Sequence, residues 1–187
     1  MTVSAVRRFC LVLGLMVAAG RAASVYAGDL PREGDVLPAF SLVSPQSPED
    51  RAVLGLSDAA TFPLGDVAAS CIIFEVIGVY CPECHKQAPL FAKLHARLSR
   101  DPNLSGRVRM LAMAAGATDK ELEYLKKKGS YPFCVVNDPE YAAHKALGEP
   151  KTPFTMIVNS QGRVLYAHLG VITDMEGFYS TIESLCR

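Results

Sequence analysis

The sequence has no excess of charge of either sign and no internal repeat. Its 187 residues include 19 basic and 19 acidic side chains, so the formal net charge at pH 7 is zero. Nothing in this balance suggests a nucleic acid or another polyanion as a partner. Low-complexity tracts are also missing. The sequence therefore predicts one soluble domain, which we expect to be a monomer.

The sequence also lacks an apolar run long enough to span a membrane as a permanent helix, which takes about 20 residues. The nearest candidate, residues 9–19, follows Arg7 and Arg8 and is followed by Val-Tyr-Ala at 25–27. This order is typical of a secretory signal with a cleavage site after small residues. We expect residues 1–27 to be a signal peptide and the protein to be periplasmic. An uncleaved segment that anchors the protein to the membrane is the alternative.

The cysteines lack the even spacing of a disulfide framework. Five of the six lie beyond the predicted signal, an odd number, and only Cys81 and Cys84 are close together. One working dithiol with scattered thiols fits this pattern best. We expect Cys71 and Cys134 to be buried thiols, with a bridge between them as an alternative, and Cys186 to be the more exposed thiol.

The segment Cys81-Pro-Glu-Cys84-His85 has two incompatible interpretations. Cys-x-x-Cys-His is the attachment site of a c-type haem, whereas Cys-x-x-Cys at the start of a helix is the dithiol of a thioredoxin-like protein. A zinc site is disfavoured because the sequence has no second Cys/His pair with ligand spacing. The elements around the motif must decide between these interpretations.

Hydrophobic periodicity predicts an alternation of strands and helices around the motif. The run 71–77 is continuously apolar except for Glu75, which is typical of a strand covered on both faces. Capping-box patterns open two later helices, at Thr118 and Thr173. The predicted order is strand 71–77, helix 82–100, strand 108–113, helix 118–128, strand 133–136, helix 139–147, a hairpin of strands 154–158 and 164–168, and a last helix ending near 185. This order predicts an α/β fold with a mixed central sheet flanked by helices.

The predicted order favours the dithiol over the haem. The motif lies where a buried strand passes into a long helix, and N–H groups at a helix start stabilise a thiolate and lower a thiol pKa. We therefore expect Cys81 to be the nucleophile and Cys84 to resolve the mixed disulfide. No cofactor and no metal are expected.

The segment IIFEVIGVYCPECHKQAPLFAKL resembles the active-site strand and helix of the thioredoxin superfamily, and the chain beyond residue 27 is most similar to exported TlpA/ResA-like thiol-disulfide oxidoreductases. Prolines and glycines among short apolar clusters at the start of that part of the chain predict a loop-rich N-terminal extension over 28–69 with one short hairpin. The resemblance implies a thioredoxin-like domain over 70–187. It rests on a redox pair, a buried acidic residue, a helix proline and a cis-proline loop, which match Cys81 and Cys84, Glu75, Pro89, and Thr152-Pro153.

The resemblance also implies an activity and partners. The protein would be a protein-disulfide reductase in which Glu75 shuttles the proton of the resolving thiol. Pro153, in the cis form, would hold Thr152 against an extended substrate segment, and Tyr80 and Pro82 would flank it. A protein thiol or disulfide would be the substrate, and a membrane or periplasmic protein would donate electrons. The identity of that substrate is left open.

Three positions depart from the family pattern. Relatives usually carry tryptophan before the first cysteine and proline before the second. This sequence has Tyr80 before Cys81, has its proline, Pro82, directly after Cys81, and contains no tryptophan at all. Gln87 replaces an acidic residue that many relatives carry three positions after the second cysteine. These departures leave the direction of electron flow open, although Glu83 and Thr152 argue against a strong oxidant.

Two other functions remain as alternatives. The first is a non-catalytic haem- or copper-binding protein that uses Cys81, Cys84 and His85. The second is a peroxidase, which would need a threonine or serine three residues before Cys81, where this sequence has Gly78.

Overall fold

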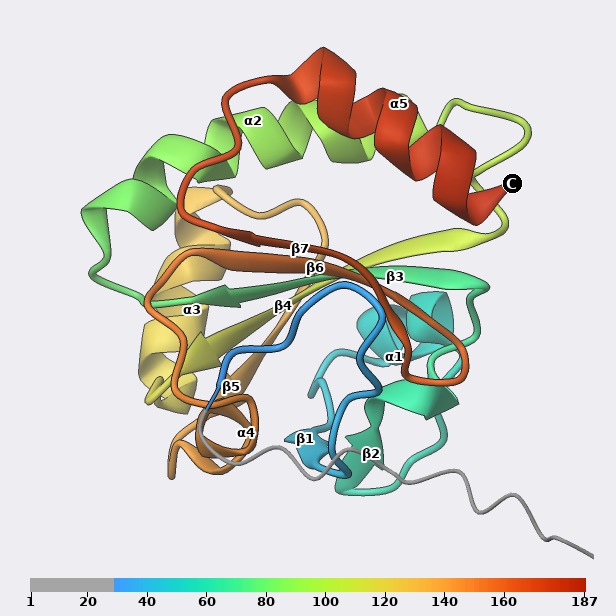
Figure 1. Ribbon diagram of the computed structural model, residues 1–187. Helices are drawn as coiled ribbons and strands as arrows, with labels where there is room; N and C mark the ends of the chain where they lie inside the picture. The colour runs from blue at the N-terminus through green and yellow to red at the C-terminus, as the bar shows by residue number, and fades with distance from the viewer. Residues whose placement is uncertain (1–28) are drawn as a thin grey trace, which may run out of the picture.

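The structure is a computed structural model that describes residues 29–187. Its central sheet has five strands and lies between layers of helices (Figure 1). The predicted signal peptide, residues 1–27, lies outside the described residues. None of the helices within 29–187 is long and apolar enough to cross a membrane. The elements are β1 (Ser41–Val43), α1 (Pro48–Leu54), β2 (Thr61–Pro63), the 3-10 turn η1 (Leu64–Asp66), β3 (Cys71–Ile77), α2 (Pro82–Leu98), β4 (Val108–Ala115), α3 (Asp119–Lys128), β5 (Cys134–Asp138), α4 (Ala142–Ala146), β6 (Phe154–Asn159), β7 (Val164–Leu169) and α5 (Met175–Cys186).

The central sheet has the strand order β5-β4-β3-β6-β7. β3 runs parallel to β4, and β4 runs parallel to β5, whereas β6 and β7 are antiparallel to their neighbours. This arrangement confirms the predicted mixed sheet flanked by helices. All seven residues of β3 are buried because the strand has a neighbour on both sides and helices on both faces.

The crossovers decide which helices share a face with the candidate site. The consecutive parallel strands β3, β4 and β5 follow one another towards one edge of the sheet. Because both connections are right-handed crossovers, α2 and α3 lie on the same face of the sheet. Side chains alternate along β3, and Ile73 and Ile77 lie in the clusters that include α2. Glu75 lies between them and faces the same way. The only charged residue of β3 is therefore beneath α2.

α5 covers the same face beside α2, and the two helices run together across the top of the sheet in Figure 1. Phe91 of α2 stacks on Phe178 of α5, with ring centroids 6.0 Å apart. Both side chains are buried in one cluster with Ile73. Burial of such aromatic side chains is a large hydrophobic contribution, so α5 holds α2 in place against β3.

The segment 29–69 covers the opposite face of the sheet. β1 and β2 pair as an antiparallel two-stranded sheet with α1 between them in the chain. Leu42, Leu54 and Phe62 share a core cluster with Phe74 of β3, so this segment is packed against the central sheet. The sequence predicted loops and one short hairpin here and missed α1. That helix is seven residues long, too short for a clear periodicity, although Ser47 caps its start.

The helix boundaries confirm one predicted cap, correct a second and shorten one predicted helix. Thr118 and Glu121 form the predicted capping box of α3. The capping box predicted from Thr173 is wrong, because the Asp174 carboxylate accepts the N–H of Gly177 and caps α5 instead. The helix predicted over 139–147 is shorter, because Tyr141 has a left-handed φ of 55° and α4 begins after it.

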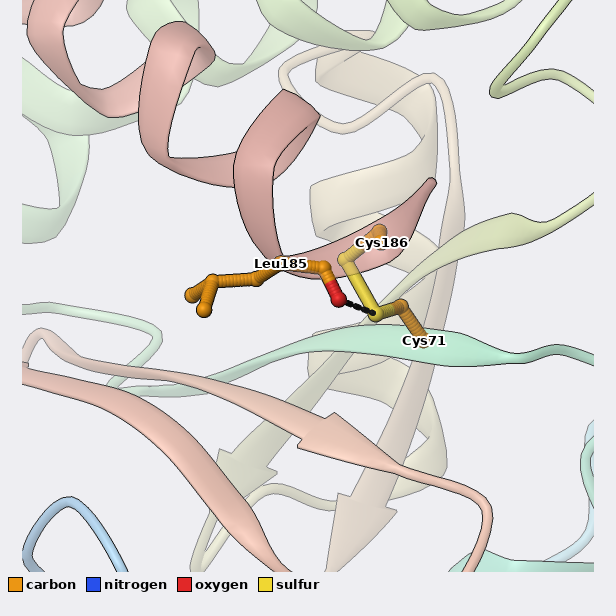
Figure 2. Close-up of a disulfide and its surroundings, with 3 residues drawn as sticks. All are labelled: Cys71, Leu185 and Cys186. Carbon is orange, nitrogen blue, oxygen red and sulfur yellow. Dashed lines mark hydrogen bonds between the residues drawn. A yellow bond between two sulfur atoms is a disulfide. The ribbon is translucent and has the colours of Figure 1, made fainter.

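Cys71 and Cys186 form a disulfide, which corrects the expectation that both are thiols and that Cys186 is exposed (Figure 2). Their Cα atoms are 5.7 Å apart, and 115 positions separate them in sequence. Both side chains are buried. Cys134 is a buried free thiol, so the alternative bridge from Cys71 to Cys134 does not form. The disulfide joins the start of β3 to the last turn of α5.

Candidate active site

The junction between β3 and α2 places Cys81 at the first turn of the helix. After Ile77, the N–H of Cys81 donates to the carbonyl of Gly78 at 3.2 Å, which closes a tight turn. Cys81 is the N-cap residue of α2, and Pro82 follows at the first helical position. Proline is well suited to this position because its φ is already helical and no N–H is needed there.

The Cys81 sulfur lies among hydrogen-bond donors. Its Sγ accepts the backbone N–H of Cys84 at 3.2 Å. Burial favours the neutral thiol, but hydrogen bonds from the side chains of Cys84 and Thr152 and from the N–H groups of Cys84 and Glu83 outweigh it. The pKa of Cys81 is consequently lowered from its ordinary value. The helix start therefore stabilises a thiolate at Cys81.

Cys84 has the opposite environment. Its side chain is fully buried, on the face of α2 that packs against the sheet. Burial, together with the hydrogen bond that its thiol makes to Cys81, raises the pKa of Cys84 to about 12. The two sulfurs of one motif thus differ in exposure and in acidity, with the more acidic thiol at the surface.

The loop before β6 meets Cys81 from the other side. The Thr152–Pro153 peptide bond is cis. The Cys81 thiol lies 3.4 Å from the carbonyl oxygen of Thr152. Gly78 completes the contact, since a Cβ atom there would lie 3.3 Å from the Cβ of Cys81 and 3.4 Å from Oγ1 of Thr152. The absence of a side chain at position 78 lets these two residues approach each other.

Glu75 lies beneath α2 as a buried carboxyl group. It is 1% exposed, and burial raises its pKa to about 8, although a hydrogen bond from Gln87 opposes the shift. The Gln87 Nε2 donates to Glu75 Oε1 at 2.7 Å. Oε2 is also buried, and it has no hydrogen-bond partner among the described residues. A carboxyl group that gains and loses its proton near neutral pH can act as a general acid or base.

Tyr131 is a residue near the dithiol that sequence reasoning missed. It is buried in one cluster with Cys84 and packs edge-on against Phe133. Burial raises the pKa of its phenol, and negative charge on Glu75, Cys84 or Cys81 raises it further. The hydroxyl group therefore lies within electrostatic reach of both thiols and of the carboxyl group. No local motif marks it, since it lies in the loop between α3 and β5.

The other predicted site residues lie at the surface around Cys81. Tyr80 is 74% exposed, and its hydroxyl donates to Glu121, which draws it towards the start of α3. Pro82 and His85 are exposed on the first turns of α2. The structure thus brings Cys81, Cys84 and Thr152 together, while Tyr80 and Pro82 form the rim.

Within residues 29–187, no group of three or more His, Cys, Asp or Glu side chains is placed to hold a metal ion.

The Redoxin family model matches residues 32–182. The chain belongs to the Redoxin family. Among curated proteins it is similar to the thiol-disulfide oxidoreductase ResA of Halalkalibacterium halodurans, with 20% identity over 117 residues. That match covers 63% of this chain and 64% of the relative, so the chain spans under two thirds of the relative's length. The TlpA/ResA-like resemblance inferred from the motifs is confirmed.

Solved structures confirm the thioredoxin-like fold. A putative thiol:disulfide interchange protein DsbE from Chlorobium tepidum has a TM-score of 0.62 at 18% identity, covering 82% of this chain and 97% of that one. StoA from Bacillus subtilis has a TM-score of 0.56 at 16% identity, covering 78% of this chain and 97% of that one. At such identities the likeness concerns the fold alone.

Proposed function

We propose that the protein is an exported thiol-disulfide oxidoreductase that reduces disulfides in protein substrates through Cys81 and Cys84. The observation that carries this proposal is the opposite environment of the two thiols. The pKa of Cys81 is lowered at the helix start, whereas the pKa of the buried Cys84 is raised to about 12. A pair of this kind attacks with one sulfur and resolves with the other.

The first step would be attack by the Cys81 thiolate on a substrate disulfide. A bond forms between Cys81 Sγ and one substrate sulfur while the substrate S–S bond breaks, and the departing sulfur takes up a proton from solvent. The cis Thr152–Pro153 loop lies against Cys81. Its backbone could pair with an extended substrate segment, which would align the disulfide with the thiolate.

The second step would use Cys84 and Glu75. The Cys84 thiol gives its proton to the Glu75 carboxylate, and the sulfur then attacks Cys81 Sγ. The Cys81–Cys84 disulfide forms, the mixed disulfide breaks, and the substrate leaves with two electrons. The pKa of Glu75 is about 8, so the fraction of carboxylate able to accept the proton increases as the pH rises towards that value.

Each turnover leaves Cys81 and Cys84 oxidised, so a partner must return two electrons. A reduced dithiol protein of the membrane or the periplasm fits that requirement. We infer the direction of electron flow from the charge beside the thiolate. Glu83 opposes ionisation of Cys81, although its ion pair with Lys86 at 2.6 Å offsets part of that effect. We expect a reduction potential nearer that of thioredoxin, about −270 mV, than that of DsbA, about −120 mV.

The alternative of haem or copper binding by Cys81, Cys84 and His85 finds no support in the site geometry. Attachment of a haem requires both cysteine sulfurs to reach the macrocycle. Cys84 is fully buried against the sheet, whereas His85 is exposed on the first turns of the helix. A ligand set built from these three residues would require the first turn of α2 to unwind.

Trapping of mixed disulfides tests the roles of the two cysteines. Cys84→Ser should accumulate covalent complexes with substrate proteins, because the nucleophile is intact and the attacker that releases the substrate is gone. Cys81→Ser is the matched control and should accumulate none. Affinity purification from the exported fraction, followed by elution with reductant, would identify the substrate.

Two results would contradict the proposal. Equal trapping by both variants, or by neither, would mean that the cysteines do not have these roles. The purified protein should reduce insulin in the presence of a thiol donor. The alternative function would be favoured if it fails to do so and carries a haem absorbance band after expression with a haem-attachment system.

A further inference from the structure

Gln87 is a fully buried side chain whose amide makes three hydrogen bonds. Its Nε2 donates to Glu75 Oε1 at 2.7 Å and to Thr155 Oγ1 at 3.2 Å. Its Oε1 accepts the backbone N–H of Ile172 at 2.8 Å. The side chain thus joins α2 to β3, to β6 and to the loop before α5.

The bond to Ile172 fixes the orientation of the amide. A backbone N–H can only donate, so the atom of Gln87 that faces Ile172 must be the oxygen. The NH₂ end then necessarily faces Glu75. An amide NH₂ donates and does not accept, so Glu75 Oε1 must be an acceptor in both protonation states. The proton of neutral Glu75 has only Oε2 left, which has no hydrogen-bond partner within residues 29–187.

We infer that Gln87 is a positioning residue that keeps Oε1 of Glu75 occupied and reserves Oε2 for the proton that Glu75 exchanges with the dithiol. This inference rests on the function proposed above. In the resolving step the S–H bond of Cys84 breaks, its electron pair stays on sulfur, and an O–H bond forms at Glu75 Oε2.

The surroundings of Glu75 leave few other groups that could hold this proton. Its cross-strand neighbours on β4 and β6 are Ala112 and Thr155, which do not titrate in this range. Charges on Glu75, Cys84 and Cys81 all affect the pKa of the Tyr131 phenol, which lies in the loop before β5. The carboxyl group and the dithiol therefore lie around the same buried side chain.

Infrared spectroscopy can locate the proton. At pH 6 Glu75 is protonated, since burial holds its pKa near 8. If the proton is on Oε2, the C=O group is Oε1 and accepts from Gln87, which lowers its stretching frequency. Gln87→Met keeps the length of the side chain and removes the donor, so the band should move to higher frequency. Glu75→Gln assigns the band by abolishing it.

Thr155→Val is the matched control for this measurement. It removes the hydroxyl that also accepts from Gln87 but leaves the bond between Gln87 and Glu75, so the band should stay in place. A band that does not move in Gln87→Met would show that the proton lies on Oε1 and would overturn the inference.

Kinetics provide the second measurement. Reaction with an aromatic disulfide releases one coloured thiol when Cys81 attacks and a second when Cys84 resolves. Gln87→Met should leave the first phase unchanged, because Glu75 takes no part in it. The rate of the second phase depends on pH with an inflection at the pKa of Glu75. In Gln87→Met this inflection should move up by at least one pH unit, which slows the second phase about tenfold at pH 7. An unmoved inflection would contradict the inference.

Gln87→Glu replaces Gln87→Met in the kinetic measurement if Gln87→Met does not fold. It retains an oxygen for Ile172 but replaces the donor with a second carboxyl group, and two adjacent carboxyl groups hold one proton between them. The inflection should again move up by at least one pH unit. If Cys81→Ser and Cys84→Ser do not separate the two phases, the proposed function fails. If they do separate them and neither Gln87 variant moves the inflection, only the inference about Gln87 fails.

Discussion

Replacement of Glu75 by glutamine should make the protein more stable at alkaline pH while slowing its resolving step. The pKa of Glu75 is raised from 4.5 to about 8 by burial. Between these two values the folded state keeps a proton that the unfolded state has lost. The unfolded state therefore binds fewer protons than the folded state, and the free energy of unfolding falls as the pH rises from about 4.5 to about 8.

The size of this loss follows from the two pKa values. A difference of one pH unit corresponds to about 1.4 kcal/mol, so the carboxyl group costs about 3 to 4 kcal/mol of stability between pH 5 and pH 8. An amide at position 75 does not titrate. Its oxygen can accept from Gln87 at the place of Oε1, and its NH₂ group takes the place of protonated Oε2. Glu75→Gln thus imitates the neutral acid at every pH.

Denaturant unfolding of both proteins at pH 5 and pH 8, in the same redox state, measures the effect. Titrations of the thiols and of surface groups are common to the two proteins and cancel in the comparison. The wild-type protein should lose about 3 to 4 kcal/mol more than Glu75→Gln over this interval. Equal losses would refute the reasoning, because Glu75 would then be ionised in the folded protein at pH 5.

Two further predictions concern the other sulfurs. A thiol-alkylating reagent at pH 7 should modify Cys81 within the folded protein and leave Cys84 unmodified, because the pKa of Cys81 is lowered and that of Cys84 is raised to about 12. Peptide mapping identifies the modified cysteine, and modification of Cys84 before Cys81 would contradict the proposed roles. Cys186→Ala should lower the free energy of unfolding by about 2 to 4 kcal/mol, since the lost disulfide to Cys71 closes a long loop. Denaturant unfolding without reductant measures this change, and an unchanged midpoint would mean that the disulfide does not constrain the unfolded chain.

Much of the fold could be predicted because it is recorded in local patterns. The apolar run of β3 and the capping box of α3 each depend on residues that are close together in the sequence. The prediction failed where two neighbouring residues could each cap the same helix. Thr173 and Asp174 are both good N-cap residues, and only the packed helix shows that Asp174 accepts from Gly177.

The buried network could not be predicted because its members are far apart in sequence. Gln87 stood out only as a residue that differs from its relatives, and nothing near it in the sequence indicates a bond to Ile172. The disulfide was missed for the same reason, since Cys71 and Cys186 are separated by 115 positions. Such contacts depend on how the helices pack on the sheet, which spacing along the chain does not encode.

The position of the disulfide has a consequence for how the protein is made. Cys81, Cys84 and Cys134 all lie between Cys71 and Cys186 in the sequence, so each of them leaves the ribosome before the proper partner of Cys71 does. Shorter loops close at a lower entropic cost, so an unfolded chain would join Cys71 to Cys81 or Cys84 more readily than to Cys186. In the folded protein Cys71 lies at the start of β3, and the strand extends about 20 Å from it to Ile77 before the chain turns towards Cys81. Docking of α5 on the sheet before the sulfurs are oxidised therefore favours correct pairing, and earlier oxidation would favour a bridge that consumes one cysteine of the proposed redox pair.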